Sequence, residues 1–257
     1  CVVCGNDVCA AGAAACPACD TLSGVQYQPA CAAATHCTFY AHGTCAATGT
    51  FSGCGDGVCG AGESAATCSV DCALALPFAD DFDAYAGAAV DPLKWPLNFG
   101  ALGSSCYNDG GRALEFRRTT NDVFDNPEGG SRQAVTAALD VAAATSGVLV
   151  SFVLNTGDAR ACDANVGASN QVTLQRSFDY GATWTTVGSY GTDGFGAHAA
   201  YVDTSAAASG GAPLTLRWDQ NQYHSSFDDW ALDSVRVTAC ADAASCTAAA
   251  ACRAAHT

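Results

Sequence analysis

Alternation of apolar and polar residues is strongest in the middle of the chain and predicts β-strands there. Residues 171–175 and 213–218 alternate cleanly, as strands do when one face is buried and the other meets solvent. Residues 148–154 are almost continuously apolar, which predicts a central strand. Further strand-like segments cover residues 112–116, 131–141, 198–203 and 230–237. Turn-forming residues separate these segments and none has the pattern of an amphipathic helix, so we predict a mainly β protein built as a β-sandwich.

The cysteines occupy a different part of the chain from the strand-like segments. Of 17 cysteines, twelve lie in residues 1–75, two in residues 76–238 and three in residues 239–257. The first region also contains two related copies of one cysteine pattern, near residues 4–19 and 54–72. We therefore expect two cysteine-rich modules with little regular secondary structure, then the sandwich, then the start of a further cysteine-rich module.

The first cysteine-rich region has too few large apolar residues to form a core, so cross-links are expected to replace one. The C-x₂-C-x₁₁-C-x₂-C spacing of a zinc ribbon occurs at Cys1, Cys4, Cys16 and Cys19. However, Cys9 interrupts this pattern and the second copy lacks the C-x₂-C pairs, which favours disulfides over zinc. The modules resemble the small knuckle or EGF-like modules of secreted multidomain proteins.

Charge and composition exclude several functions. The chain has 10 Lys and Arg against 25 Asp and Glu, for a net charge of -15, and its only lysine is Lys94. This excludes a nucleic-acid-binding surface, because phosphate contacts need clustered positive charge. No apolar run is long enough to insert into a membrane. The cysteine content favours an oxidising compartment, so we expect a segment of a longer secreted or cell-surface protein.

One local motif is sharply defined. Ser177, Asp179, Gly181 and Trp184 form S-x-D-x-G-x-T-W, the pattern called an Asp-box. We expect a structural hairpin turn in which Asp179 accepts hydrogen bonds from turn amides, Gly181 adopts an unusual backbone angle and Trp184 covers the turn. Sialidases carry several such boxes and an arginine cluster, whereas one copy is present here, so the motif does not predict an enzyme. No other set of residues predicts catalysis.

Acidic residues flanked by aromatic residues occur near both ends of the predicted sandwich, at residues 80–83 and 227–233. The first and last strands of a sandwich commonly lie side by side, which would bring these carboxylates together. Hard oxygen ligands at such a point suit Ca²⁺. The alternative is that they are solvated turn charges, which is reasonable in a chain with this many acids.

The order of motifs from about residue 80 to residue 238 resembles a reelin subrepeat, the jelly-roll half of a reelin repeat. The matching pieces are Asp80–Asp83 as an acidic opening strand, Trp95, Asn98-Phe99-Gly100, Gly103-Ser104-Ser105-Cys106, residues 112–116, residues 132–136, Cys162, the Asp-box, residues 216–220 and residues 229–233. The resemblance implies an extracellular jelly-roll β-sandwich used in assembly and adhesion, without catalysis.

The same resemblance implies two features at named residues. One is a disulfide between Cys106 and Cys162. The other is calcium bound near the paired ends of the sandwich, with Asp81, Asp83 and Asp233 as the candidate ligands.

We expect a structural or adhesive module of a secreted glycoprotein that builds an extracellular filament or matrix. Its partners would be other copies of itself or other extracellular structural proteins, and its composition is similar to that of flagellar mastigoneme glycoproteins. The alternative is a calcium-dependent carbohydrate-binding jelly roll of a cell-surface protein. An aromatic platform for glycans could come from Trp95, Trp218, Tyr223 and Trp230, although Trp218 and Trp230 lie in strand patterns that favour the core.

Overall fold

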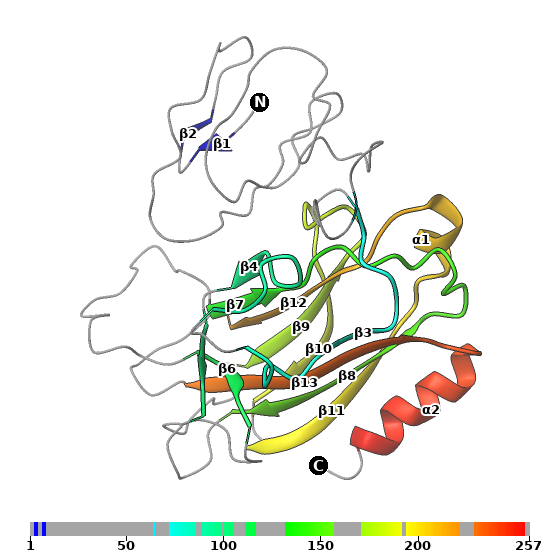
Figure 1. The fold of residues 1–257 in the computed structure, drawn as a ribbon. Helices are drawn as coiled ribbons and strands as arrows, with labels where there is room; N and C mark the ends of the chain where they lie inside the picture. The colour runs from blue at the N-terminus through cyan, green and yellow to red at the C-terminus, as the bar shows by residue number, and fades with distance from the viewer. Residues whose placement is uncertain are drawn as a thin grey trace.

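Two antiparallel sheets face each other and form a jelly-roll β-sandwich (Figure 1). The computed structural model describes residues 3–4, 7–8, 64, 72–85, 89–98, 100–104, 111–116, 132–156, 171–191, 194–220 and 229–254. The prediction of a mainly β jelly roll is confirmed. Of the predicted flanking modules, the described part includes a short antiparallel pair, β1 (Val3–Cys4) with β2 (Asp7–Val8), and the remainder of residues 1–71 apart from residue 64 lies outside it.

The first sheet has the strand order β10-β9-β12-β7-β4. Its strands are β4 (Leu97–Asn98), β7 (Arg132–Val135), β9 (Val172–Ser177), β10 (Thr185–Tyr190) and β12 (Thr215–Gln220). The alternating segments predicted at residues 171–175 and 213–218 are β9 and β12, so that prediction is confirmed. β10 was not among the predicted strands.

The second sheet has the order β11-β8-β13-β6-β5, and β3 also pairs with β13. Its strands are β3 (Phe78–Asp80), β5 (Ala101–Gly103), β6 (Ala113–Phe116), β8 (Val148–Asn155), β11 (Phe195–Val202) and β13 (Trp230–Ala239). β8 lies between β11 and β13, as expected for the central strand. β3 and β13, the first and last strands of the sandwich, pair through Val235 and Asp80 in one register position.

Large side chains from both sheets fill the space between them. Trp218 of β12 packs against Trp95 and against Phe152 of β8, with ring centroids 6.1 and 5.4 Å apart. On the other sheet Trp230 stacks on Phe116 at 3.8 Å. These rings are almost completely buried, so they form the core that the composition of residues 76–238 predicted.

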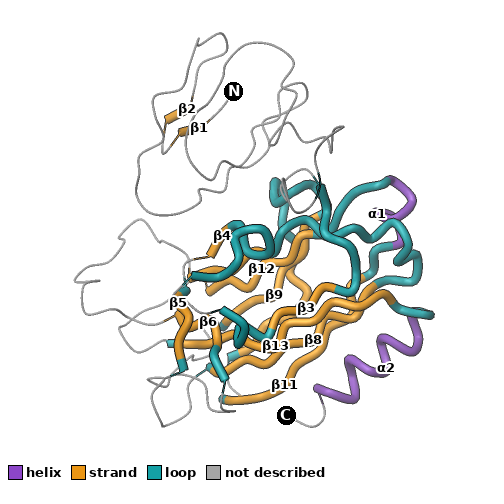
Figure 2. The backbone as a smooth tube through the Cα atoms, in the orientation of Figure 1, coloured by secondary structure: helices purple, strands orange, loops and turns teal. Residues whose placement is uncertain are grey.

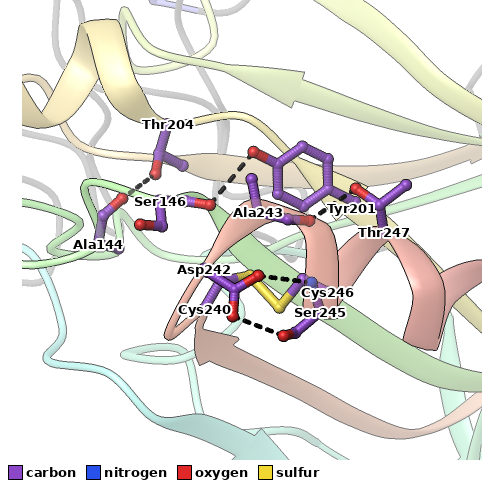
Figure 3. Close-up of a disulfide and its surroundings, with 10 residues drawn as sticks. All are labelled: Ala144, Ser146, Tyr201, Thr204, Cys240, Asp242, Ala243, Ser245, Cys246 and Thr247. Atoms are coloured by element: carbon purple, nitrogen blue, oxygen red, sulfur yellow. Dashed lines mark hydrogen bonds between the residues drawn. A yellow bond between two sulfur atoms is a disulfide. The ribbon is translucent and has the colours of Figure 1, made fainter.

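In the described part of the chain, two helices lie at the margins of the sandwich (Figure 2). α1 (Ser205–Gly210) is a single short turn region after β11, and α2 (Ala243–Ala254) packs along β11. A disulfide between Cys240 and Cys246 joins the end of β13 to α2 (Figure 3). The Asp242 carboxylate accepts hydrogen bonds from the amide and hydroxyl of Ser245 at 2.7 and 2.5 Å, which caps the start of the helix. Whether this tail opens a further cysteine-rich module stays a prediction.

Candidate functional site

A pocket of about 390 Å³ opens beside β3, where that strand meets β13. The turn after β3, the loop that precedes β4 and the middle of β13 form its walls. Its charged and polar lining residues are Asp80, Asp81, Tyr85, Asp91, Lys94, Ser234 and Arg236. The pocket therefore lies at the acidic opening segment that the sequence singled out. The chain's only lysine also lines it.

Asp80 is the central residue of this region. Its side chain is only 4% exposed and forms an ion pair of 3.5 Å with Lys94. One carboxylate oxygen, Oδ2, accepts hydrogen bonds from Tyr85 Oη at 2.5 Å and from Trp95 Nε1 at 2.9 Å. The other, Oδ1, accepts from the Phe82 amide at 3.0 Å. Because a buried carboxylate is stable only when it is paired and hydrogen-bonded, these partners fix Asp80 as a structural acceptor.

Tyr85 acts as a donor to this carboxylate. Partial burial, together with the hydrogen bond to Asp80 and the charge of Asp80, raises the pKa of Tyr85 far above its ordinary value. Its hydroxyl therefore stays protonated and donates throughout the physiological pH range. Arg112 also contacts this residue, because its Nη1 donates a hydrogen bond to the Tyr85 carbonyl oxygen.

Two residues beside the pocket have left-handed backbone conformations. Phe82 has φ 59° and Ser234 has φ 49°. Phe82 is nonetheless completely buried, and its ring packs on Trp95 at 5.4 Å. Ser234 lies in the register shift of β13 between Asp233 and Arg236. Such conformations cost free energy in residues with side chains, and their concentration at a pocket is typical of functional sites.

The three predicted calcium ligands lie near this pocket, but each accepts a hydrogen bond from a different main-chain amide. Asp81 is exposed, and its Oδ1 accepts from the Asp83 amide at 3.3 Å. Asp83 Oδ1 accepts from the Arg112 amide at 2.6 Å. Asp233 is buried on β13, with Oδ1 2.5 Å from the Ser234 amide. In the described part of the chain no three acidic, histidine or cysteine side chains are arranged to hold a metal ion, so a calcium ion here would also need main-chain oxygens or water as ligands. Calcium binding stays a prediction.

The Asp-box residues form the turn between β9 and β10. Asp179 accepts hydrogen bonds from the Thr183 amide and hydroxyl at 2.9 and 2.5 Å, and Ser177 donates to it at 2.6 Å. Gly181 has φ 85°, a conformation that glycine adopts without strain. Partial burial acts to raise the pKa of Asp179, but the hydrogen bonds from Ser177 and Thr183 outweigh it and lower that pKa below 3.8.

Trp184, the last residue of this motif, points to the first sheet. The Arg217 guanidinium of β12 lies over its ring at 4.3 Å. Arg217 also donates to Gln175 Oε1 of β9 at 2.7 Å and to Gln133 Oε1 of β7 at 3.5 Å. Neighbouring Asp219 is only 4% exposed, and its Oδ1 has no hydrogen-bond partner among the described residues. Burial raises the pKa of Asp219 and the charge of Arg217 lowers it less.

The proposed aromatic platform for glycans is wrong at three of its four residues. Trp95, Trp218 and Trp230 are 2%, 0% and 0% exposed and belong to the core, as the strand pattern favoured for the last two. A residue buried between the sheets cannot stack on a sugar. Tyr223, the fourth residue, lies outside the described residues.

The predicted cysteine pair cannot be placed. Cys106 and Cys162 lie outside the described residues, so their disulfide stays a prediction that peptide mapping under non-reducing conditions tests. In the described tail, Cys252 is an exposed free cysteine on α2.

The sequence did not single out five of the polar or charged pocket residues, namely Tyr85, Asp91, Lys94, Ser234 and Arg236. Lys94 was noted only as the single lysine, and it lies 14 positions beyond the carboxylate that it pairs with. Ser234 follows the acidic stretch at residues 229–233, and nothing in the local sequence indicates that its φ is positive. A lone cation close after an acidic strand was the one available indication of an ion pair.

Comparison with known proteins places the sandwich in context. The family model described as Reelin subrepeat B matches residues 100–238, which is more than half of the chain. No curated protein matches the chain. Among solved structures, the C-terminal family 22 carbohydrate-binding module of Clostridium thermocellum Xyn10B is 12% identical, with 64% of this chain and 94% of that chain covered and a TM-score of 0.38.

Proposed function

Because the chain belongs to the reelin subrepeat family, we propose that it is an extracellular structural and adhesive module that builds a filament or matrix through protein–protein contacts. The family match over residues 100–238 is the observation that carries this proposal. The cysteine content supports an oxidising, extracellular location. No helix in the described part of the chain is long and apolar enough to cross a membrane. We assign no catalytic activity.

Self-association of the oxidised chain tests this proposal. Sedimentation velocity over a wide concentration range should show oligomers that grow with concentration, and electron microscopy of the native material should show polymers or a surface assembly. A monodisperse monomer at every concentration would contradict the assembly role.

Calcium is part of the proposal through the family resemblance, with Asp81, Asp83 and Asp233 as candidate ligands. A ligand that binds only the folded state raises the melting temperature. Titration of residues 76–238 with calcium should therefore raise it, and magnesium at equal ionic strength should raise it less. No shift at millimolar calcium would remove the site. A shift that survives in Asp81→Asn would place the ion elsewhere.

The alternative is a calcium-dependent carbohydrate-binding module. Three tryptophans of the predicted platform lie in the core, but one observation still favours this alternative. Trp184 is partly exposed, the Arg217 guanidinium lies over its ring, and that guanidinium donates hydrogen bonds to Gln175 and Gln133. An aromatic ring next to amide and guanidinium groups is a chemistry that binds sugars. Specific binding on a glycan array that is lost in Trp184→Ala would promote this alternative over the assembly role.

A further inference from the structure

The chain enters and leaves the sandwich through two neighbouring strands (Figure 1). β3 and β13 pair antiparallel, with Phe78 opposite Val237 and Asp80 opposite Val235. The chain therefore enters β3 at the same end of the pair at which it leaves β13. Tension between the cysteine-rich region and the tail acts at this one end. Because antiparallel ladder bonds run across the strands, such a load breaks them one after another, and they do not share it.

The two strands of this pair are anchored very unequally. β13 pairs with β8 from Ala231 to Ala239, and β8 pairs in turn with β11 over its whole length. Beyond β13, the Cys240–Cys246 disulfide carries tension directly to α2, so the short loop between them is not loaded. β3 has three residues, and among the described strands it pairs with β13 alone. Under load, β3 should therefore separate before β13 does.

Residues 74–82, here called the strap, include β3. Ahead of β3, the Leu74 amide donates to the Ala138 carbonyl oxygen at 2.7 Å, and the Leu74 carbonyl oxygen accepts from the Asp140 amide at 2.8 Å. These two bonds meet the load first. The outer side of the strap borders the open pocket described above, where Ala79 is exposed. Few backbone bonds therefore hold the strap, and its side chains must supply much of its resistance.

The Asp80 side chain provides the strongest of these attachments. It accepts a hydrogen bond from Trp95 Nε1 at 2.9 Å and pairs with Lys94 at 3.5 Å. Lys94 Nζ also donates to the Ala79 carbonyl oxygen at 3.1 Å, and the Lys94 carbonyl oxygen accepts from the Ala137 amide at 2.8 Å. The strap is thus tied to the loop before β4 and, through Lys94, to the chain that follows β7 in the first sheet. Hydrogen bonds to a charged group are roughly twice as strong as neutral ones, so the Asp80 carboxylate outweighs any single backbone bond of the strap.

We propose that the strap is a tension-release element: force between the cysteine-rich region and the tail peels residues 74–82 from the sandwich while the rest of both sheets stays folded, and the Asp80 carboxylate sets the force required. This inference rests on the proposed structural function, in which the module carries load between its neighbours, and adds a response to that load. Release of the strap takes Phe78 and Phe82 off the ring of Trp95, whose centroid lies 5.8 and 5.4 Å from theirs. A loaded module therefore exposes an aromatic surface that an unloaded module buries.

Single-molecule force spectroscopy on the full oxidised chain, held at its two ends, tests the proposal. Release of the strap should give an early step of at most about 30 Å, because an extended residue spans roughly 3.5 Å. Asp80→Asn removes the charge of the carboxylate, and Lys94→Met removes its ion-pair partner at a partly exposed position. Asp179→Asn is the matched control, because Asp179 is also a hydrogen-bonded carboxylate but lies in the turn between β9 and β10, off the loaded strands. Melting temperatures confirm that each variant is folded.

The rate of the early step at constant force is the quantity to compare. Asp80→Asn should raise this rate at least about tenfold and Lys94→Met at least about threefold, while Asp179→Asn should leave it within about twofold. Steps from the cysteine-rich region should be the same in all variants. Without load, amide hydrogen exchange in β3 should be faster than in β8, and faster still in Asp80→Asn. If Asp80→Asn does not fold, Lys94→Met alone decides the test.

Three results would overturn the strap. The first is rupture of the sandwich in one step, with no early event. The second is an early step whose rate neither Asp80→Asn nor Lys94→Met changes. The third is equal acceleration by Asp179→Asn, which would assign the effect to overall stability. None of these results touches the assembly role, which sedimentation velocity tests separately, and a chain that never self-associates would remove that role while the early step could still be measured.

Discussion

Two buried tryptophans give a direct test of how much the Asp80 network stabilises the fold. Trp95 and Trp218 pack against each other and are 2% and 0% exposed. Trp95 Nε1 donates to Asp80 Oδ2 at 2.9 Å, whereas Trp218 Nε1 has no hydrogen-bond partner among the described residues. Replacing each by phenylalanine removes the same atoms from the same core. The difference between the two variants therefore isolates the indole hydrogen bond.

The expected difference follows from the partners. A hydrogen bond to a charged group contributes about 2 kcal/mol, and Trp95→Phe loses it. Trp218→Phe instead removes a buried donor that has no partner, which recovers about 1 kcal/mol of desolvation cost. Both variants also lose packing, about equally. Trp95→Phe should therefore be less stable than Trp218→Phe by about 3 kcal/mol.

Urea unfolding under non-reducing conditions, followed by far-ultraviolet circular dichroism, measures this difference. Equal slopes for the two variants would show that the same surface is exposed on unfolding, so that the midpoints can be compared. Trp95→Phe in an Asp80→Asn background completes a double-mutant cycle, and its coupling should be well above zero. Equal stabilities for the two single variants, or a less stable Trp218→Phe, would refute the role assigned to Asp80.

Three further predictions concern other parts of the sandwich. The folded-state pKa of Asp179 lies below its ordinary value of 3.8, so the contribution of its carboxylate to stability is present above that pH and is lost as the pH falls through the folded pKa. Asp179→Ala should therefore lower the free energy of unfolding by about 1 kcal/mol at pH 7, measured by urea unfolding. A loss of stability that persists in strong acid would contradict this. The folded-state pKa of Asp219 is raised, so its charge opposes folding as the pH rises past 3.8; Asp219→Asn should raise the melting temperature at pH 7, and a lower one would show that the charge is needed. The Cys240–Cys246 disulfide closes a loop with a sequence separation of 6, and a loop of that size corresponds to a stabilisation of about 2 kcal/mol. Replacing both cysteines by serine should therefore speed amide hydrogen exchange in α2. Unchanged exchange would show that packing on β11 is enough to hold the helix.

The strands that could be predicted are those whose inner face is made of large apolar residues. β8, β9, β12 and β13 all alternate or run apolar because one face is in the core. β10 was missed for the opposite reason: it is an edge strand of small polar residues with one large inward side chain, Tyr190. Its place is determined by the turn before it and by β9 beside it, neither of which appears in its own pattern.

The helix at the end of the chain was missed for another reason. α2 consists mostly of alanine, which has the highest helix propensity but gives no apolar stripe to recognise. Its cysteines drew attention to a disulfide-rich module instead. The structure shows that one of those cysteines, Cys246, ties the helix to the strand before it.

The acidic opening segment was located correctly, but the roles of its residues depend on distant neighbours. Residues 80–83 alternate between inward and outward positions, so Asp80 enters the core while Asp81 and Asp83 remain exposed. The partners that make Asp80 a structural residue, Lys94 and Trp95, come from the loop before β4. Local sequence indicates that several carboxylates are present, and only the packing decides which of them is available to a ligand.

This division of roles determines how a ligand in the pocket would act on the fold. β3 has three residues and pairs with β13 over only that length, so its backbone ladder holds it weakly. The side-chain bonds of Asp80 to Tyr85 and Trp95 supply the remaining attachment. A cation that competed for Asp80 would break those bonds and loosen β3. A cation bound through the exposed Asp81 would leave them intact and add a contact. A cation that stabilises the sandwich from this pocket is therefore expected to bind the outward carboxylates, and Asp80→Asn should weaken folding without abolishing such binding.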